Sequence, residues 1–109
     1  MAKVATFSDG DNALVVARER LATASLSAVA SSDASQQLLA ANGLRSGMVI
    51  VNTDANALYI KYGTTASATS FTYLIAAGGT WTMPEPVFTG RIDGIWAADG
   101  SGSAYITEL

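Results

Sequence analysis

From about residue 44 onward, short apolar runs alternate with clusters of turn residues, which is the pattern of a β-protein. Residues 48–52 form a β-branched run, and we expect a strand that is covered on both faces. Residues 57–62 alternate between apolar and polar positions, as a half-buried strand does. Turn-forming residues occupy positions 53–56, so the pattern predicts that these two strands pair as a hairpin.

Similar short runs recur along the rest of the chain at intervals of about 8–12 residues. Pro84 and Pro86 end one of them, because proline cannot donate to a strand ladder. Helical periodicity is missing from the sequence after residue 21. The prediction is an all-β fold, an antiparallel β-sandwich of jelly-roll-like type. Its further strands are expected near residues 21–30, 35–40, 71–75, 80–83, 90–97 and 104–109.

The first third of the chain has weaker strand character and holds much of the charge. Residues 13–21 suit either a short helix, capped by Asp11 or Asn12, or an extended segment. We therefore expect an N-terminal extended arm over residues 1–20 and a β-sandwich domain over residues 21–109. An arm of this kind usually grips a neighbouring subunit. Its expected contact residues are Phe7, Leu14, Val15, Val16, Arg18 and Arg20.

The composition favours association with other chains. Only 14% of the 109 residues are charged, against roughly 25% in ordinary globular domains. Half of the residues are apolar, but aromatic residues make up only 8% of the chain. A chain with few charges and few large core residues fits a symmetric assembly, in which flat faces meet other copies. We expect a homo-oligomer, as a dimer or a trimer.

Charge and hydropathy argue against two classes of partner. The net charge is −3 and no cluster of Lys and Arg is present, which argues against nucleic acid as a partner. No apolar run approaches the roughly 18 residues of a membrane span, so no membrane partner is expected. A secretory apolar segment is also not recognisable at the start of the sequence. We expect the protein to act where it is made or inside an assembly.

The residues that usually carry catalysis or bind metals are scarce. The sequence contains no His and no Cys, which removes the commonest general base and the common zinc ligands. Glu85, Asp93 and Asp99 each lie beside Gly or Pro, and we interpret them as solvated turn residues rather than an acid pair. The acidic run at 9–12 is interpreted as a turn, because its spacing does not match a calcium loop. We expect no enzyme activity, no cofactor and no metal.

Aromatic residues are the remaining candidates for binding. Trp81 with Tyr73, or Trp96 with Tyr105, would suit the stacking platform that sugars need, although strand aromatics more often face the core. Trp96 is expected in the core. For Trp81 the sequence allows three roles, which are core packing, a protein interface and a ligand site. The aromatics predicted as exposed interface candidates are Tyr59 and Trp81.

Three segments carry a resemblance to a known group of proteins. The segments are residues 49–63, 65–72 and 86–109. Their pattern is Asn-(Asp or Ser)-x-Asn-x-Leu-Tyr-hydrophobic-Lys-x-Gly, followed loosely in the first segment, then Gly-hydrophobic-Trp at 94–96 and Thr-Glu at 107–108. This combination resembles small virion structural proteins of tailed bacteriophages and covers about residues 36–109. The resemblance implies a capsid decoration, or cement, protein on the capsid exterior, with the major capsid protein as its partner. It leaves open a tail-fibre or receptor-binding module for glycans, and a tail or portal adaptor.

Overall fold

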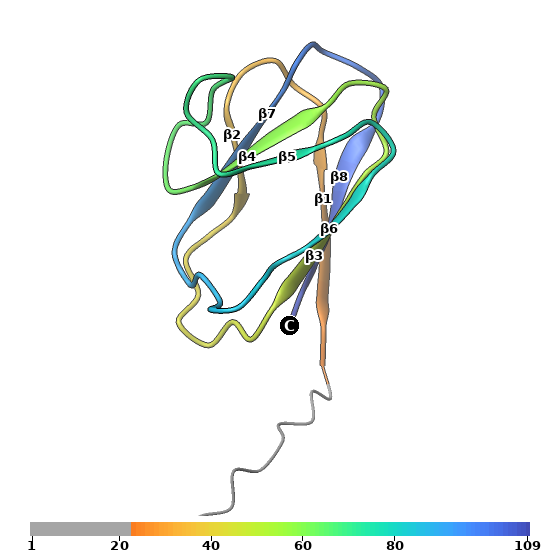
Figure 1. Ribbon diagram of the computed structural model, residues 1–109. Coiled ribbons are helices and arrows are strands. Elements are labelled where there is room, and N and C mark those ends of the chain that lie inside the picture. Colours follow the sequence, from red (N-terminus) through yellow and green to blue (C-terminus); the bar gives the residue numbers. More distant parts are fainter. Residues whose placement is uncertain (1–22) are drawn as a thin grey trace, which may run out of the picture.

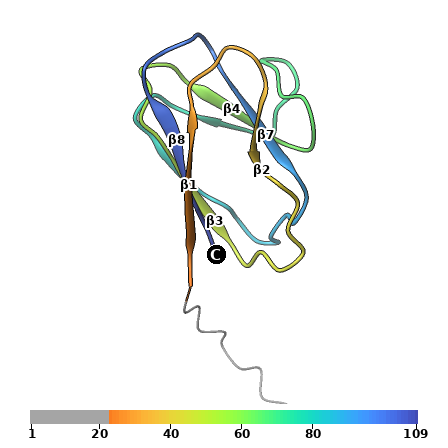
Figure 2. The same cartoon turned by 180° about the vertical axis from the view of Figure 1, so that it is seen from behind.

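The computed structural model describes residues 23–109, which form two antiparallel four-stranded sheets packed face to face (Figures 1 and 2). Every strand pair is antiparallel, and this part of the chain contains no helix, so none that could cross a membrane. The all-β sandwich predicted from the sequence is therefore confirmed. Its strands are β1 (Ser25–Ala30), β2 (Gln36–Leu39), β3 (Met48–Asn52), β4 (Leu58–Tyr62), β5 (Tyr73–Ile75), β6 (Thr80–Thr82), β7 (Ile92–Trp96) and β8 (Ser103–Glu108).

The strand order is that of a jelly roll. One sheet, the first sheet, has the order β1-β8-β3-β6, and the second sheet has the order β2-β7-β4-β5. The chain can be followed as one long hairpin that turns between β4 and β5 and pairs β3 with β6, β2 with β7 and β1 with β8. Rolling this hairpin places β8 beside β3 and β7 beside β4. The result is the two-sheet arrangement of eight strands that defines the jelly roll.

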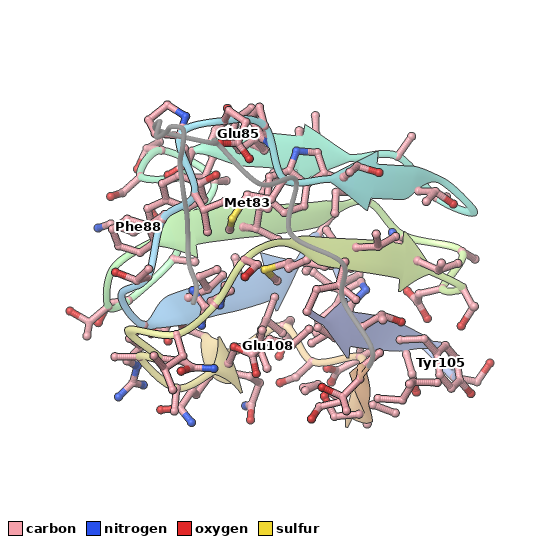
Figure 3. All side chains as sticks on the ribbon, turned by 90° about the horizontal axis from the view of Figure 1, so that it is seen from below. Met83, Glu85, Phe88, Tyr105 and Glu108 are labelled. Atoms are coloured by element: carbon pink, nitrogen blue, oxygen red, sulfur yellow. The ribbon has the colours of Figure 1, made fainter. Side chains whose placement is uncertain are left out.

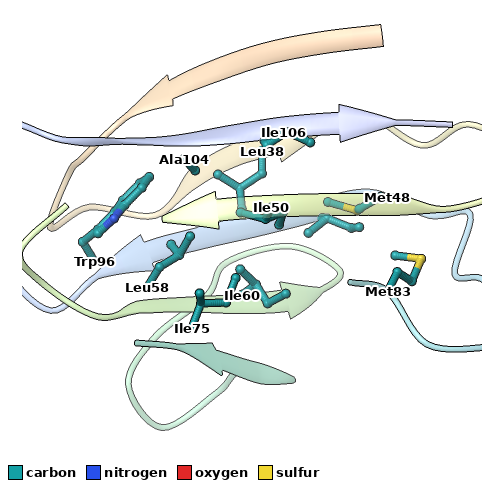
Figure 4. Close-up of a cluster of buried hydrophobic side chains, with 11 residues drawn as sticks. Leu38, Met48, Ile50, Leu58, Ile60, Ile75, Met83, Trp96, Ala104 and Ile106 are labelled. Atoms are coloured by element: carbon teal, nitrogen blue, oxygen red, sulfur yellow. The ribbon is translucent and has the colours of Figure 1, made fainter. Parts of the chain in front are cut away.

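The core lies between the two sheets and is built from alternate strand residues (Figure 4). On β3, Met48 and Ile50 are buried while the intervening Val49 is half-buried, which follows from the two-residue period of a strand. Trp96 is 1% exposed, which confirms its predicted place in the core. The expectation that residues 48–52 are covered on both faces is wrong, because the outward positions of β3 stay half-open to solvent. The remaining core side chains are Leu38, Leu58, Ile60, Ile75, Met83, Ile92, Ala104 and Ile106.

The predicted hairpin between residues 48–52 and 57–62 is wrong in its pairing. Both strands form, but β3 belongs to the first sheet and β4 to the second. The turn at 53–56 therefore carries the chain across the sandwich. Turn residues between two strands signal a reversal of the chain equally well in a hairpin and in a connection between sheets. The partners that decide between them, β8 and β7, come much later in the sequence.

The predicted arm at residues 1–20 lies outside the described residues, and so do its proposed contacts. Neither the helical nor the extended alternative for residues 13–21 is tested by the structure. The sandwich itself begins with β1 at Ser25, four residues after the predicted domain start at Leu21.

Candidate interaction surfaces

The outer face of the first sheet carries no charged strand residue within the described part of the chain. The register fixes which side chains point outward, because residues that pair directly across strands lie on the same face. Tyr105 pairs with Ala28 and Val51, while the buried Ile106 pairs with Ser27 and Ile50. The outward set continues along all four strands. Its members are Leu26, Ala28, Ala30, Val49, Val51, Thr80, Thr82, Ser103, Tyr105 and Thr107. We call this set the uncharged face.

Two large side chains on the uncharged face are open to solvent. Leu26 is 77% exposed and Tyr105 is 53% exposed. In Figure 3 Tyr105 lies at the periphery of the molecule, whereas Glu108, on the same strand, lies nearer the middle of the view. Glu108 points inward because it pairs with the buried Met48. The strand thus keeps its charge on the inner side and presents apolar, hydroxyl and aromatic groups outward.

The outer face of the second sheet is different, because it carries charges and is partly covered. Lys61 and Asp93 pair across β4 and β7 on this face. The Lys61 ammonium donates to the Ser70 hydroxyl at 2.7 Å, and the amide of Thr65 donates to Asp93 at 2.8 Å. These bonds hold the loop between β4 and β5 against the sheet.

The interpretation of Asp93 as a solvated turn residue is wrong. Asp93 is 3% exposed, lies within β7 and forms an ion pair with Arg91 at 2.7 Å. The flanking Gly94 suggested a turn, but it is buried in the strand, where a Cβ would collide with the Leu38 side chain. Asp99 and Glu85 are exposed, as predicted, and Asp99 accepts a hydrogen bond from the amide of Asp33. Asp93 thus fixes the loop between β4 and β5 to the second sheet.

The predicted aromatic candidates occupy intermediate positions. Trp81 is half-buried and faces inward, because it pairs with the buried Ile50. Its ring lies 5.0 Å from that of Tyr73, so the structure brings this predicted pair together. Trp96 and Tyr105 lie on opposite sides of the first sheet, inside and outside, and form no platform. Tyr59 is half-buried on the outer face of the second sheet.

Trp81 belongs to an aromatic cluster at one end of the sandwich. Tyr62 stacks on Phe88, with ring centroids 4.4 Å apart and planes within 2° of parallel. Tyr73 and Trp81 pack beside Tyr62 at centroid distances of 5.8 and 6.5 Å. Burial, and secondly the neighbouring Tyr73, raise the pKa of the Tyr62 hydroxyl. The cluster packs against the core, so its first role is to close that end of the molecule.

The turn at 53–56 is organised by buried polar side chains. The Asn52 carbonyl oxygen accepts from the Trp96 indole at 3.0 Å, and its amide nitrogen lies within hydrogen-bond distance of three backbone carbonyls. Asp54 accepts from the amides of Gly102 and Asn56. Chiefly the Gly102 N–H bond lowers the pKa of Asp54. A Cβ at Gly102 would collide with the Asp54 backbone, so only glycine allows this close approach.

Within residues 23–109 no group of three or more acidic side chains is placed to hold a metal ion. The buried charged side chains Arg45, Asp54 and Asp93 have structural partners instead. The Arg45 side chain is fully buried, pairs with Glu108 at 2.8 Å, and donates to the carbonyls of Phe88, Gly90 and Ala40. The sequence offered no sign of this role for Arg45, which lies in an ordinary turn context.

Comparisons of the chain with protein-family models, with curated proteins and with solved structures found no match. The resemblance to phage virion proteins therefore stays a prediction from the sequence. The structure shows what the polar residues of the segment 49–63 do: Asn52, Asp54 and Asn56 build the connection between the two sheets.

Proposed function

We propose that the protein is a capsid decoration protein that binds the exterior of a phage shell through the uncharged face. The observation that carries the proposal is the lack of charge across the outward strand residues of the first sheet. Burying a charge against a partner costs free energy unless it is paired, and interface cores are accordingly depleted in charged residues. The resemblance of residues 36–109 to virion proteins supplies the setting.

In this proposal the major capsid protein is the partner, and each copy bridges adjacent capsid subunits. The uncharged face supplies one contact, and residues 1–20 supply a second, as the sequence suggests. Two linked contacts bind more tightly than either contact alone. The proposal assigns the protein no catalytic step, as expected from the sequence.

A matched pair of surface variants tests the proposal. Tyr105 and Leu74 are both 53% exposed, but Tyr105 lies on the uncharged face and Leu74 on the outer face of the second sheet. We expect Tyr105→Lys to weaken binding to purified shells at least about tenfold, and Leu74→Lys to bind like the natural chain. Co-sedimentation with shells measures both. Equal binding of the two variants would remove the uncharged face from the proposal.

A glycan-binding module is the second candidate, and one observation favours it. Phe71 is 43% exposed and meets Tyr59 edge-on with ring centroids 4.9 Å apart, on the outer face of the second sheet. Exposed aromatic rings of this kind can stack on sugars, and jelly rolls include lectin domains. Under this candidate, Phe71→Ala abolishes binding on a glycan array. Trp81→Ala serves as the comparison, because Trp81 faces the interior.

A further inference from the structure

The outer edge of β1 is the most open strand edge among the described residues. β1 is six residues long and lies at the end of the first sheet, with only β8 beside it (Figure 2). Residues 21–32 contain no charged residue and no proline. Natural proteins usually protect such edges with charges, prolines, bulges or short strands, because an open edge can pair with another chain.

The other edge strands of the sandwich carry such protection. β6 and β5 are three residues long, and β6 is followed closely by Pro84 and Pro86. β2 is four residues long and its pairing with β7 shifts register between Gln37 and Leu39. β1 is therefore the exception, because its unpaired N–H and C=O groups are free of such protection and can pair with another strand.

The backbone groups that face the open edge can be identified from the register. The amide of Ser31 donates to the carbonyl of Gly102 at 3.0 Å, in line with the pairing of β1 and β8. Hydrogen-bonded and non-hydrogen-bonded pairs alternate along an antiparallel ladder. Ser25, Ser27 and Val29 therefore bond to β8. The residues that turn their N–H and C=O groups to the open edge are Leu26, Ala28 and Ala30.

We propose that a second copy of this chain pairs with β1 along this edge, antiparallel and around a two-fold axis at Ala28. In that register Ala28 lies opposite Ala28 of the other copy, and Leu26 lies opposite Ala30. Each of these is a hydrogen-bonded pair that exchanges two bonds, so about six backbone bonds form. The proposal deepens the proposed function and rests on it only for its biological setting.

The side chains favour a second copy over an unrelated strand. Leu26, Ala28 and Ala30 all point to the uncharged face, so two-fold pairing opposes no like charges and buries no charge. The pairing joins the uncharged faces of both copies into one surface across a continuous sheet. A strand pair of this length covers less than the roughly 800 Å² per partner of a standard interface. We therefore expect a dimer that forms at high protein concentration and dissociates on dilution.

Single cysteine variants test the register, because the natural chain has no cysteine. Hydrogen-bonded partners have Cα atoms about 5.5 Å apart, which is within disulfide reach. Under mild oxidation of the full chain, we expect Ala28→Cys to form a linked dimer at least about tenfold faster than Leu26→Cys or Thr82→Cys. Leu26 is 77% exposed and Thr82 is also exposed, so poor access would not explain their slower reaction. Equal rates at all three positions would overturn the proposal.

Ala28→Pro gives a second test, because the Ala28 N–H faces the open edge and is not needed for pairing with β8. In analytical ultracentrifugation without shells, we expect the natural chain to dimerise with rising concentration and the variant to stay monomeric. Its thermal midpoint at low concentration should match that of the natural chain. A natural chain that stays monomeric at all concentrations would overturn the proposal. With a monomeric natural chain, loss of shell binding in Ala28→Pro at an unchanged midpoint would instead assign the edge to a capsid strand. Because this assay contains no capsid protein, its failure leaves the proposed function standing.

Discussion

Asn52 joins three parts of the chain that are distant in sequence. Its side chain links the Trp96 indole on β7 to the turn before β4 and to the carbonyls of Ile75 and Ala76 at the end of β5. The residue is fully buried. A buried amide costs free energy unless its donors and acceptor are paired, and here they are. The side chain therefore fixes how the two sheets meet at this end of the sandwich.

Replacing Asn52 by Ala should destabilise the protein by about 2–4 kcal/mol, because it leaves the Trp96 N–H and backbone carbonyls without partners. Asn56→Ala is the control, since Asn56 is half-buried and its side chain donates to only one acceptor, Asp54. Urea denaturation of each variant gives the free energy of unfolding. If the two variants lost equal stability, the Asn52 network would not have the role described.

Asp54 should make stability depend on pH in acid. Because its pKa in the folded protein lies below the ordinary value of 3.8, the unfolded chain binds a proton first as the pH falls. The stabilisation is present above pH 3.8 and is lost as the pH falls through the lower, folded pKa. The free energy of unfolding of the natural chain should therefore decline between about pH 5 and pH 2, and the decline should be smaller in Asp54→Asn. A decline of the same size in both proteins would show that Asp54 does not contribute.

At the scale of elements, local pattern predicted most strands but not their partners. The strand at Met48–Asn52 can be predicted from its own residues alone, because side-chain alternation is a local property. The pairing of β1 with β8 joins residues at opposite ends of the described chain, and no local signal encodes it. The uncharged face depends on that pairing, so the sequence suggested Tyr59 and Trp81 rather than Tyr105. Arg45 was missed for the same reason, since its partner Glu108 lies 63 residues away.

Arg45 holds the last strand against two loops, and its loss should be costly. Arg45→Leu leaves Glu108 and three carbonyls without their donor, which predicts a loss of about 3–5 kcal/mol. Glu108→Gln leaves the buried guanidinium without its counter-ion but keeps the bonds from Arg45 to the carbonyls, so we expect a smaller loss than in Arg45→Leu. Thermal and urea denaturation measure both. Equal losses in the two variants would place the whole effect in the ion pair and contradict the role given to the carbonyl bonds.

Deleting residues 1–20 tests the sequence-based arm as a second contact. We expect the shortened chain to keep the unfolding midpoint of the natural chain, because the described sandwich starts at Ser25. Its binding to shells should weaken at least about tenfold, as expected when one of two linked contacts is removed. Undiminished binding in co-sedimentation would remove the arm from the proposal and leave the uncharged face as the contact.

At the scale of the whole molecule, the two outer faces of the sandwich are unequal. The second sheet holds its charges in bonds with the β4–β5 loop, whereas the first sheet carries none on its outward strand residues. The open edge of β1 borders the same uncharged face. We therefore propose that the first sheet faces partners and that the second sheet faces solvent.

A cryo-EM reconstruction of the virion that encodes this chain would show which sheet faces the shell. We expect jelly-roll density on the outside of the shell, with the first sheet turned toward capsid protein and with β1 beside a symmetry-related β1. Density at the tail, as for an adaptor ring or a fibre, or density on the shell with the uncharged face open to solvent, would contradict it.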